Sequence, residues 1–128
     1  MAKRVFVFGS NTAGFHGAGA AKFAYEKKGA QWGKGYGHYG DSFAIPTKDR
    51  DIQTLPLEVI EYFIHGFLAY AYTHPKLNFQ VSPIGCSPTS YKDSDIAPMF
   101  EGAPENCMFD LRWKSWLGDD YRYFTYKG

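Results

Sequence analysis

The sequence predicts an α/β domain in which a parallel or mixed sheet carries helices on both faces. Segments typical of strands and helices alternate in the order β-α-β-α-β-α-β, which is the order found in such sheets. The first segment, residues 4–8, is apolar without polar alternation, as in strands buried on both faces. The length of 128 residues fits a single domain over 1–128 that folds without disulfides or a metal.

The first half of the chain contains two of the predicted strands. Residues 9–17 form a loop after the first strand, and residues 17–28 are Ala-rich with lysines in the last turn, which predicts a helix. Residues 29–40 hold five glycines interleaved with aromatic side chains, a composition typical of a loop. The second strand is predicted over 42–46, where a proline ends it.

The second half begins with the longest predicted helix, over 55–73. Its apolar residues recur at helical spacing, and Thr54 is in the place of an N-cap. A strand over 78–84, a short helix over 93–100 with acids in its first turn, and a weak strand over 107–109 follow. These elements complete the alternation that defines the predicted class.

Charge is unevenly distributed although the net charge is only +1. Residues 1–50 hold eight Lys and Arg against three acids, whereas residues 51–111 hold two against eight. The glycine-rich first third is therefore the electropositive part, where an anionic ligand would bind. The near-neutral total argues against nucleic acid as a partner, because such binding depends on many basic contacts to phosphate.

Cysteine usage and hydropathy indicate the compartment. Cys86 and Cys107 form neither a CxxC motif nor a disulfide framework, and no apolar run reaches the length of a membrane span. We therefore expect a reduced, cytoplasmic protein with no signal peptide and no membrane contact. The sequence predicts neither a cofactor nor a metal site, and it leaves a homo-oligomer open.

Two predicted loops follow strands at the carboxyl edge of the sheet, where open α/β sheets bind ligands. They are residues 9–19 and 85–91. Small residues in the first loop let a ligand approach the backbone, and the N–H groups at the start of the next helix would bind phosphate. The loop matches neither Walker A nor GxGxxG, so a tight turn with small residues for packing stays an alternative.

Four short motifs carry a resemblance to a known family. They are FGSN at 8–11, GAGA at 17–20, AIPTK at 44–48 and PIGC at 83–86. Together they resemble a macrodomain-like family of small bacterial and phage proteins, over about residues 4–110. Macrodomains bind ADP-ribose or its derivatives, so the resemblance implies a macrodomain-like sheet and a cleft for an ADP-ribose-like nucleotide.

The resemblance also implies roles for single residues. Asn11 would face the distal ribose, the backbone of Gly17, Ala18 and Gly19 would line the diphosphate, and loop 85–91 would form the second wall. The second loop lacks the glycines of the family, and its hydroxyl side chains offer replacement contacts. The expected ligand-binding residues are Gly9, Ser10, Asn11, His16, Gly17, Ala18, Gly19, Thr47, Gly85, Cys86, Ser87, Thr89, Ser90 and Tyr91.

Several of these side chains admit a structural interpretation as well as a functional one. Asn11 and His16 are candidate catalytic residues, but His16 could instead be a capping or surface histidine. Cys86 is either a nucleophile or a small buried cysteine. Asp49 and Asp51 could orient a water or a ribose hydroxyl, or belong to a solvated charged turn. Tyr91 is expected to stack on the ligand, because it closes the second loop.

The sequence therefore predicts a protein that binds ADP-ribose or an ADP-ribose-derived nucleotide. It would act as a reader of ADP-ribose marks, or as a sponge that sequesters a nucleotide immune signal in the host cytoplasm on behalf of a phage. Hydrolysis of an ADP-ribosyl or phosphoribosyl linkage in the same pocket stays open. A different class is an interaction module for nucleic acid or protein that uses the aromatic and basic tail at 112–128.

Overall fold

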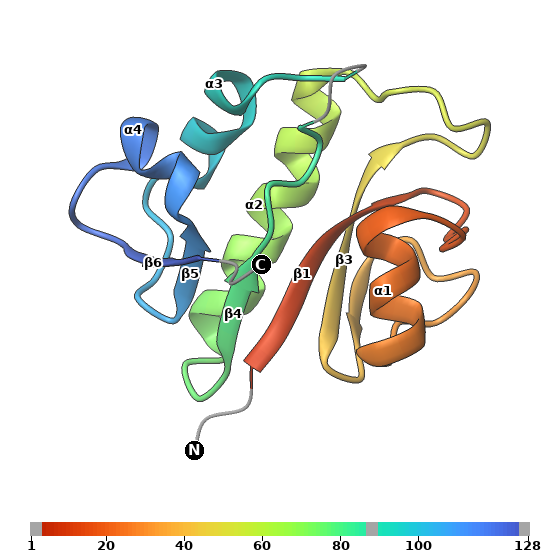
Figure 1. Ribbon diagram of the computed structural model, residues 1–128, viewed down its shortest axis with the longest axis horizontal. Helices are drawn as coiled ribbons and strands as arrows, with labels where there is room; N and C mark the ends of the chain where they lie inside the picture. Colours follow the sequence, from red (N-terminus) through yellow and green to blue (C-terminus); the bar gives the residue numbers. More distant parts are fainter. Residues whose placement is uncertain (1–3, 87–89, 126–128) are drawn as a thin grey trace.

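The computed structural model describes residues 4–86 and 90–125, which form a six-stranded sheet with helices on both faces (Figure 1). The strands are β1 (Arg4–Asn11), β2 (Gly37–Tyr39), β3 (Ser42–Lys48), β4 (Asn78–Val81), β5 (Cys107–Asp110) and β6 (Arg122–Phe124). The helices are α1 (Gly19–Lys27), α2 (Leu57–Thr73), α3 (Asp93–Ile96) and α4 (Lys114–Leu117), with 3-10 turns η1 (Ala97–Phe100) and η2 (Leu111–Trp113). The predicted α/β class with a mixed sheet is confirmed.

The strand order β2-β3-β1-β4-β5-β6 makes the sheet grow in both directions from β1. All neighbouring strands are parallel except β2 and β3. The chain passes from β1 through α1 to β3 on one side, and from β3 through α2 to β4 on the other. The winding therefore reverses between the carboxyl ends of β1 and β4, which is the position where doubly wound sheets bind ligands.

Alternate side chains of β1 pack on the two faces of the sheet. Phe6 and Phe8 pack with the small buried side chains of α1, whereas Val5 and Val7 belong to the larger core under α2. The buried side chains that α2 contributes recur at helical spacing and are Ile60, Ile64, Phe67 and Ala71. Burial from both sides explains why the first strand has no polar alternation.

The two central strands are longer than the sequence predicts. β1 continues through Asn11, which pairs with Lys48, so residues 9–11 are strand and not loop. β3 also continues past Pro46, which pairs with Ser10 immediately before a shift of register. A proline fits such an irregular position because it has no N–H to donate to the ladder.

The glycine-rich segment 29–40 is also only partly loop, because residues 37–39 form the antiparallel edge strand β2. A Cβ atom at Gly35 would collide with the carbonyl of Asn11, and one at Gly14 would collide with the backbone at Lys34. Gly33 N donates to Gly14 O at 2.9 Å. This segment therefore braces the loop after β1 through backbone contacts that only glycine permits.

In the second half, α2 is confirmed, but Pro56 and not Thr54 stands at its N-cap. Thr54 instead forms a bridge with Lys48. The predicted strand over 78–84 ends earlier, at Val81, and the predicted helix over 93–100 consists of α3 followed by η1.

The segment 112–125 completes the sheet and the core. Trp113 is fully buried, with its ring centroid 5.3 Å from that of Phe100, and β6 pairs in parallel with β5. The aromatic composition of this segment therefore serves packing to a large extent. Within 4–86 and 90–125, no helix is long and apolar enough to cross a bilayer.

Candidate functional site

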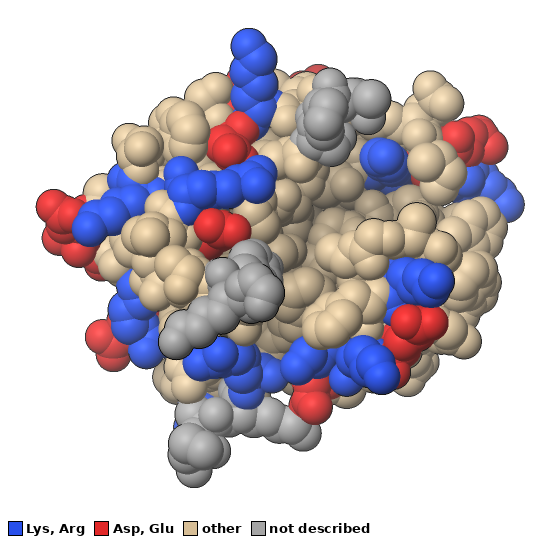
Figure 2. All heavy atoms as spheres, viewed as in Figure 1, with Lys and Arg blue, Asp and Glu red and all other residues tan. Residues whose placement is uncertain are grey.

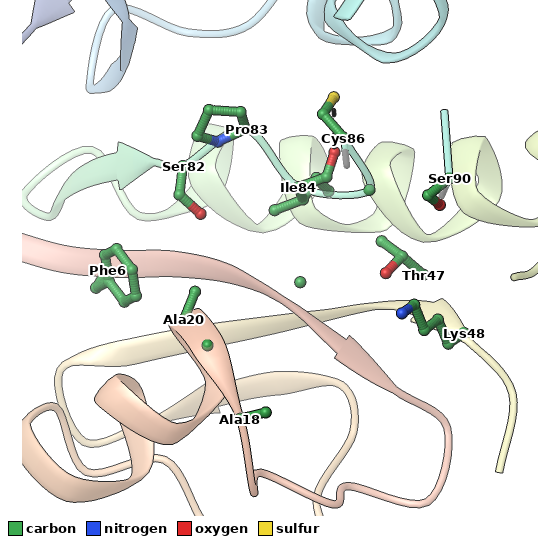
Figure 3. Close-up of a pocket in the computed structure, with 13 residues that line it drawn as sticks. Phe6, Ala18, Ala20, Thr47, Lys48, Ser82, Pro83, Ile84, Cys86 and Ser90 are labelled. Atoms are coloured by element: carbon green, nitrogen blue, oxygen red, sulfur yellow. Dashed lines mark hydrogen bonds between the residues drawn. The ribbon is translucent and has the colours of Figure 1, made fainter. Parts of the chain in front are cut away.

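The carboxyl edge of the sheet carries two adjoining cavities, which we name together the switch-point groove. The inner cavity has a volume of about 480 Å³ and lies between the start of α1 and the loop after β4 (Figure 3). The outer cavity has a volume of about 420 Å³ and lies against the loop after β1. Both are lined by Gly9, Ala18, Thr47 and Lys48. Figure 2 shows a hollow in the face of the molecule that is turned toward the viewer in Figure 1.

Helix α1 begins at the inner cavity, which Ala18, Gly19 and Ala20 line. Lys22 N donates to Ala18 O at 3.1 Å, so the N–H groups of residues 19–21 precede the first helical hydrogen bond. The first turn contains no acidic residue, and no side chain caps it. The partial positive charge of the helix start therefore faces the cavity without a compensating carboxylate.

Lys48 is the charged residue of the groove. It lines both cavities from the end of β3, and Figure 3 shows its side chain beside Thr47 with the nitrogen turned toward the cavity. No carboxylate in the described part of the chain forms an ion pair with Lys48. Neither cavity is lined by a described Asp or Glu. The electrostatics of the groove therefore favour an anion.

Lys48 is not among the binding residues expected from the sequence, although it lies within the AIPTK motif. The available signal was a cation directly after a buried strand, at the edge where the two predicted loops also lie. The extension of β3 past Pro46 carries Lys48 to that edge.

Most of the predicted binding residues lie together. Those that line the groove are Gly9, Ser10, Asn11, Gly17, Ala18, Gly19, Thr47, Gly85, Cys86 and Ser90. His16 and Tyr91 line neither cavity. The predictions for Ser87 and Thr89 lie outside the described residues.

Asn11 uses its side chain within the loop. Its Nδ2 donates to Phe15 O at 2.8 Å, and its Oδ1 accepts from Phe15 N at 2.9 Å. This pair of bonds closes the turn and places the exposed ring of Phe15 in the wall of the outer cavity. The role that the structure shows for Asn11 is therefore to shape the site.

His16 lies in the core and away from the groove. Its ring is 1% exposed, Nε2 donates to Gln31 O at 2.9 Å and lies 3.2 Å from Lys34 O, and Nδ1 lies 3.5 Å from Ser10 Oγ. The imidazole therefore joins the loop after β1 to the glycine-rich segment. Both nitrogens face protein atoms, so the structure favours the structural interpretation of His16 over acid–base chemistry.

Cys86 has the properties of a packed thiol. Burial, and secondly the neighbouring Asp93, raises the pKa of its thiol to about 12. Its Sγ donates to Ile84 O at 3.3 Å, and Figure 3 shows the sulfur turned away from Ala18 and Ala20. Because the thiolate is the nucleophilic form, a raised pKa makes this cysteine a poor nucleophile at neutral pH.

Tyr91 and Asp49 also stabilise loops. The hydroxyl of Tyr91 donates to Leu55 O at 2.8 Å, and its ring packs against the core under α2. One carboxylate oxygen of Asp49 accepts from Asp51 N at 2.8 Å and from Gln53 N at 3.0 Å. These contacts give no support to the expected stacking of Tyr91 on a ligand. The carboxylate of Asp49 stabilises a turn.

The basic and aromatic residues at 112–125 are largely engaged in the fold. Arg112 pairs with Asp93 at 2.8 Å, and the indole N–H of Trp113 donates to the same carboxylate oxygen at 2.9 Å. Trp116 stays partly exposed. The exposed basic side chains of Arg112, Lys114 and Arg122 already contact Asp93, Asp119 and Asn78, respectively.

Among the described residues, no group of three or more His, Cys, Asp or Glu side chains could hold a metal ion. No protein-family model matches the sequence, and comparison with curated proteins and with solved structures finds no match.

Proposed function

We propose that the switch-point groove binds an anionic nucleotide of the ADP-ribose type. The observation that carries this proposal is Lys48, a cation without a described ionic partner that lines both cavities beside the start of α1. A lysine and a helix N-terminus at one cavity are the combination with which proteins bind phosphate groups. The resemblance to macrodomains supports the same ligand class from the sequence.

The dimensions of the groove support a ligand with more than one part. Each cavity, at about 480 Å³ and about 420 Å³, lies within the roughly 300–1,000 Å³ range of small-molecule sites. The phosphates would lie at the start of α1 and Lys48. The hydroxyls of Thr47 and Ser90 line the inner cavity, where a sugar would replace or share their long contacts of 3.4 Å to Ser10 O and 3.5 Å to Thr54 Oγ1. A nucleotide that extends into the outer cavity would use the whole length of the groove.

The chemistry of the groove favours binding without turnover. Its described lining contains no carboxylate and no histidine, and the thiol of Cys86 is held protonated. General acid–base or nucleophilic catalysis most often uses a group of one of these kinds within reach of the ligand. We therefore propose a reader of ADP-ribose marks or a cytoplasmic sponge for a nucleotide signal.

Calorimetric titration with ADP-ribose tests this proposal, with Lys48→Ala as the decisive variant. Loss of a charge-assisted contact to phosphate weakens binding by about 10- to 100-fold. Lys76→Ala is the matched control, because Lys76 is exposed in the turn before β4, at the opposite edge of the sheet. Equal affinity of the Lys48→Ala variant and the wild type would contradict the proposed site.

A second titration series separates the two modes of binding. A reader should bind an ADP-ribosylated peptide at least as tightly as free ADP-ribose, whereas a sponge should prefer a free cyclic or base-substituted derivative. Release of ADP-ribose from the peptide during the titration would show turnover and contradict the binding-only proposal.

A further inference from the structure

We infer that the outer cavity binds the flat aromatic ring of a nucleotide base, held by Phe15 and Ile52. This inference rests on the proposed function and adds the position of the base. Both side chains line the outer cavity, and both are exposed, at 44% for Phe15 and 48% for Ile52. Apolar side chains exposed at a cavity contribute favourable free energy to binding when a ligand covers them.

Phe15 is held in a fixed position at the rim. The side chain of Asn11 binds both the N–H and the carbonyl of Phe15. The ring of Phe15 also packs on that of Trp32, with centroids 6.0 Å apart and planes tilted by 31°. A ring that is fixed before the ligand arrives loses little conformational freedom on binding, and aromatic side chains are the usual platforms for bases.

Ile52 has the backbone conformation of a strained residue. Its φ is 61°, and no other non-glycine residue in the described part of the chain has a positive φ. Left-handed backbone is rare for a β-branched side chain, and such strain is concentrated at ligand-binding and catalytic sites. Burial in the core does not account for this conformation, because the side chain is half exposed.

The turn that contains Ile52 is tied together by hydrogen bonds. Ile52 N donates to Asp49 O at 3.1 Å, and Asp49 N donates to Gln53 O at 2.8 Å. The carboxylate of Asp49 accepts two further bonds, from Asp51 N and Gln53 N. Asp49 is therefore a positioning residue, because these bonds maintain the turn that carries Ile52 at the groove.

The lining residues that the two cavities share indicate how a bound nucleotide would be oriented. Lys48 lines both, so a phosphate at Lys48 and the start of α1 would leave the attached nucleoside free to extend into the outer cavity. The base then lies at Phe15 and Ile52, and the ribose that carries it lies beside Asn11. The family resemblance, in contrast, places the distal ribose at Asn11.

Titrations with AMP and with ribose 5-phosphate test this inference, because both ligands carry one phosphate and one ribose but only AMP carries a base. We expect wild-type protein to bind AMP more tightly. Phe15→Ala and Ile52→Gly should each weaken AMP binding by about tenfold, the scale of one stacked base, and leave ribose 5-phosphate binding unchanged. Tyr62→Ala, which removes an exposed ring on α2, is the control and should change neither affinity.

Thermal unfolding of the variants distinguishes a loss of binding from a loss of folding. Glycine accepts the φ of 61° without strain, so the Ile52→Gly variant should unfold at a temperature no lower than that of the wild type. Wild-type protein that binds both ligands equally, or variants that lose both ligands to the same extent, would overturn the inference and leave the proposed function standing. Failure of the wild type to bind either ligand would overturn both.

Discussion

At the scale of single residues, polar side chains beside the groove have two different uses. Asn11 and His16 carry the chemistry that a sequence reader notices first, yet both bind the protein itself. Lys48 is the side chain whose charge stays available to a ligand. Buried polar groups are nearly always hydrogen-bonded. A polar side chain near a site can therefore bind a ligand only where it has no hydrogen-bond or ionic partner within the protein.

His16→Ala should destabilise the protein without a specific effect on the groove. The change removes a buried ring and the donor that serves two carbonyl oxygens, at a cost of about 3 kcal/mol in the free energy of unfolding. Denaturation in urea measures this cost. His65→Ala is the control, because His65 is exposed on α2 and its removal should alter stability little. An unchanged unfolding midpoint for His16→Ala would contradict the structural role.

At the scale of elements, Asp93 connects α3 to η2. Burial alone would raise the pKa of Asp93, but hydrogen bonds from Arg112, Trp113 and Cys86 together lower it below the ordinary value of 3.8. Because the folded state favours the charged form, this carboxylate stabilises the fold fully above pH 3.8 and loses its contribution as the pH falls through the lowered pKa.

Asp93→Asn should therefore lower stability in a pH-dependent way. Asparagine still accepts a hydrogen bond from Trp113 but does not form the ion pair with Arg112. The difference in unfolding free energy between wild type and variant should be largest at neutral pH and should narrow below about pH 3.8. Urea denaturation at a series of pH values measures it. A difference that stays constant down to the lowest pH would exclude this ionic contribution.

The sequence predicts the elements with strong periodicity and misses those that packing creates. The apolar first strand and the stripe of α2 are visible because burial selects their residues directly. The edge strands β2 and β6 have three residues each and no apolar alternation, so their pairing depends on neighbours distant in the chain. The two loops of the groove can be predicted from the order of the elements along the chain. The positions of Lys48 and Ile52 at the groove cannot, because they depend on how far β3 extends and on how the turn after it closes.

At the scale of the whole molecule, the two halves of the chain share one groove and the larger of the two cores. The first half supplies β1, α1 and Lys48, and the second half supplies the loop after β4. Residues 51–111 are acidic overall, yet none of their described carboxylates lines the groove. The fold therefore separates the negative charge of the chain from the site that would bind an anion.

Removal of residues 112–128 should unfold the whole domain and not merely detach a tail. The truncation removes β6, the buried Trp113 and Leu117. Loss of a buried tryptophan side chain alone costs about 3–5 kcal/mol, against a total stability of about 5–15 kcal/mol for a typical domain. Circular dichroism during thermal unfolding should show no cooperative transition for the truncated chain. A truncated protein that melts cooperatively and binds ADP-ribose would contradict this prediction.

The central position of β1 also bears on how the chain folds as a ribosome makes it. The strand that is synthesised first needs β3 on one side and β4 on the other, and the core beneath them stays open until Trp113 emerges. Pairing between segments distant in sequence is slow to form, and the exposed edges of a half-made sheet invite aggregation. We therefore expect the nascent chain to depend on chaperones until the segment that contains Trp113 has left the exit tunnel.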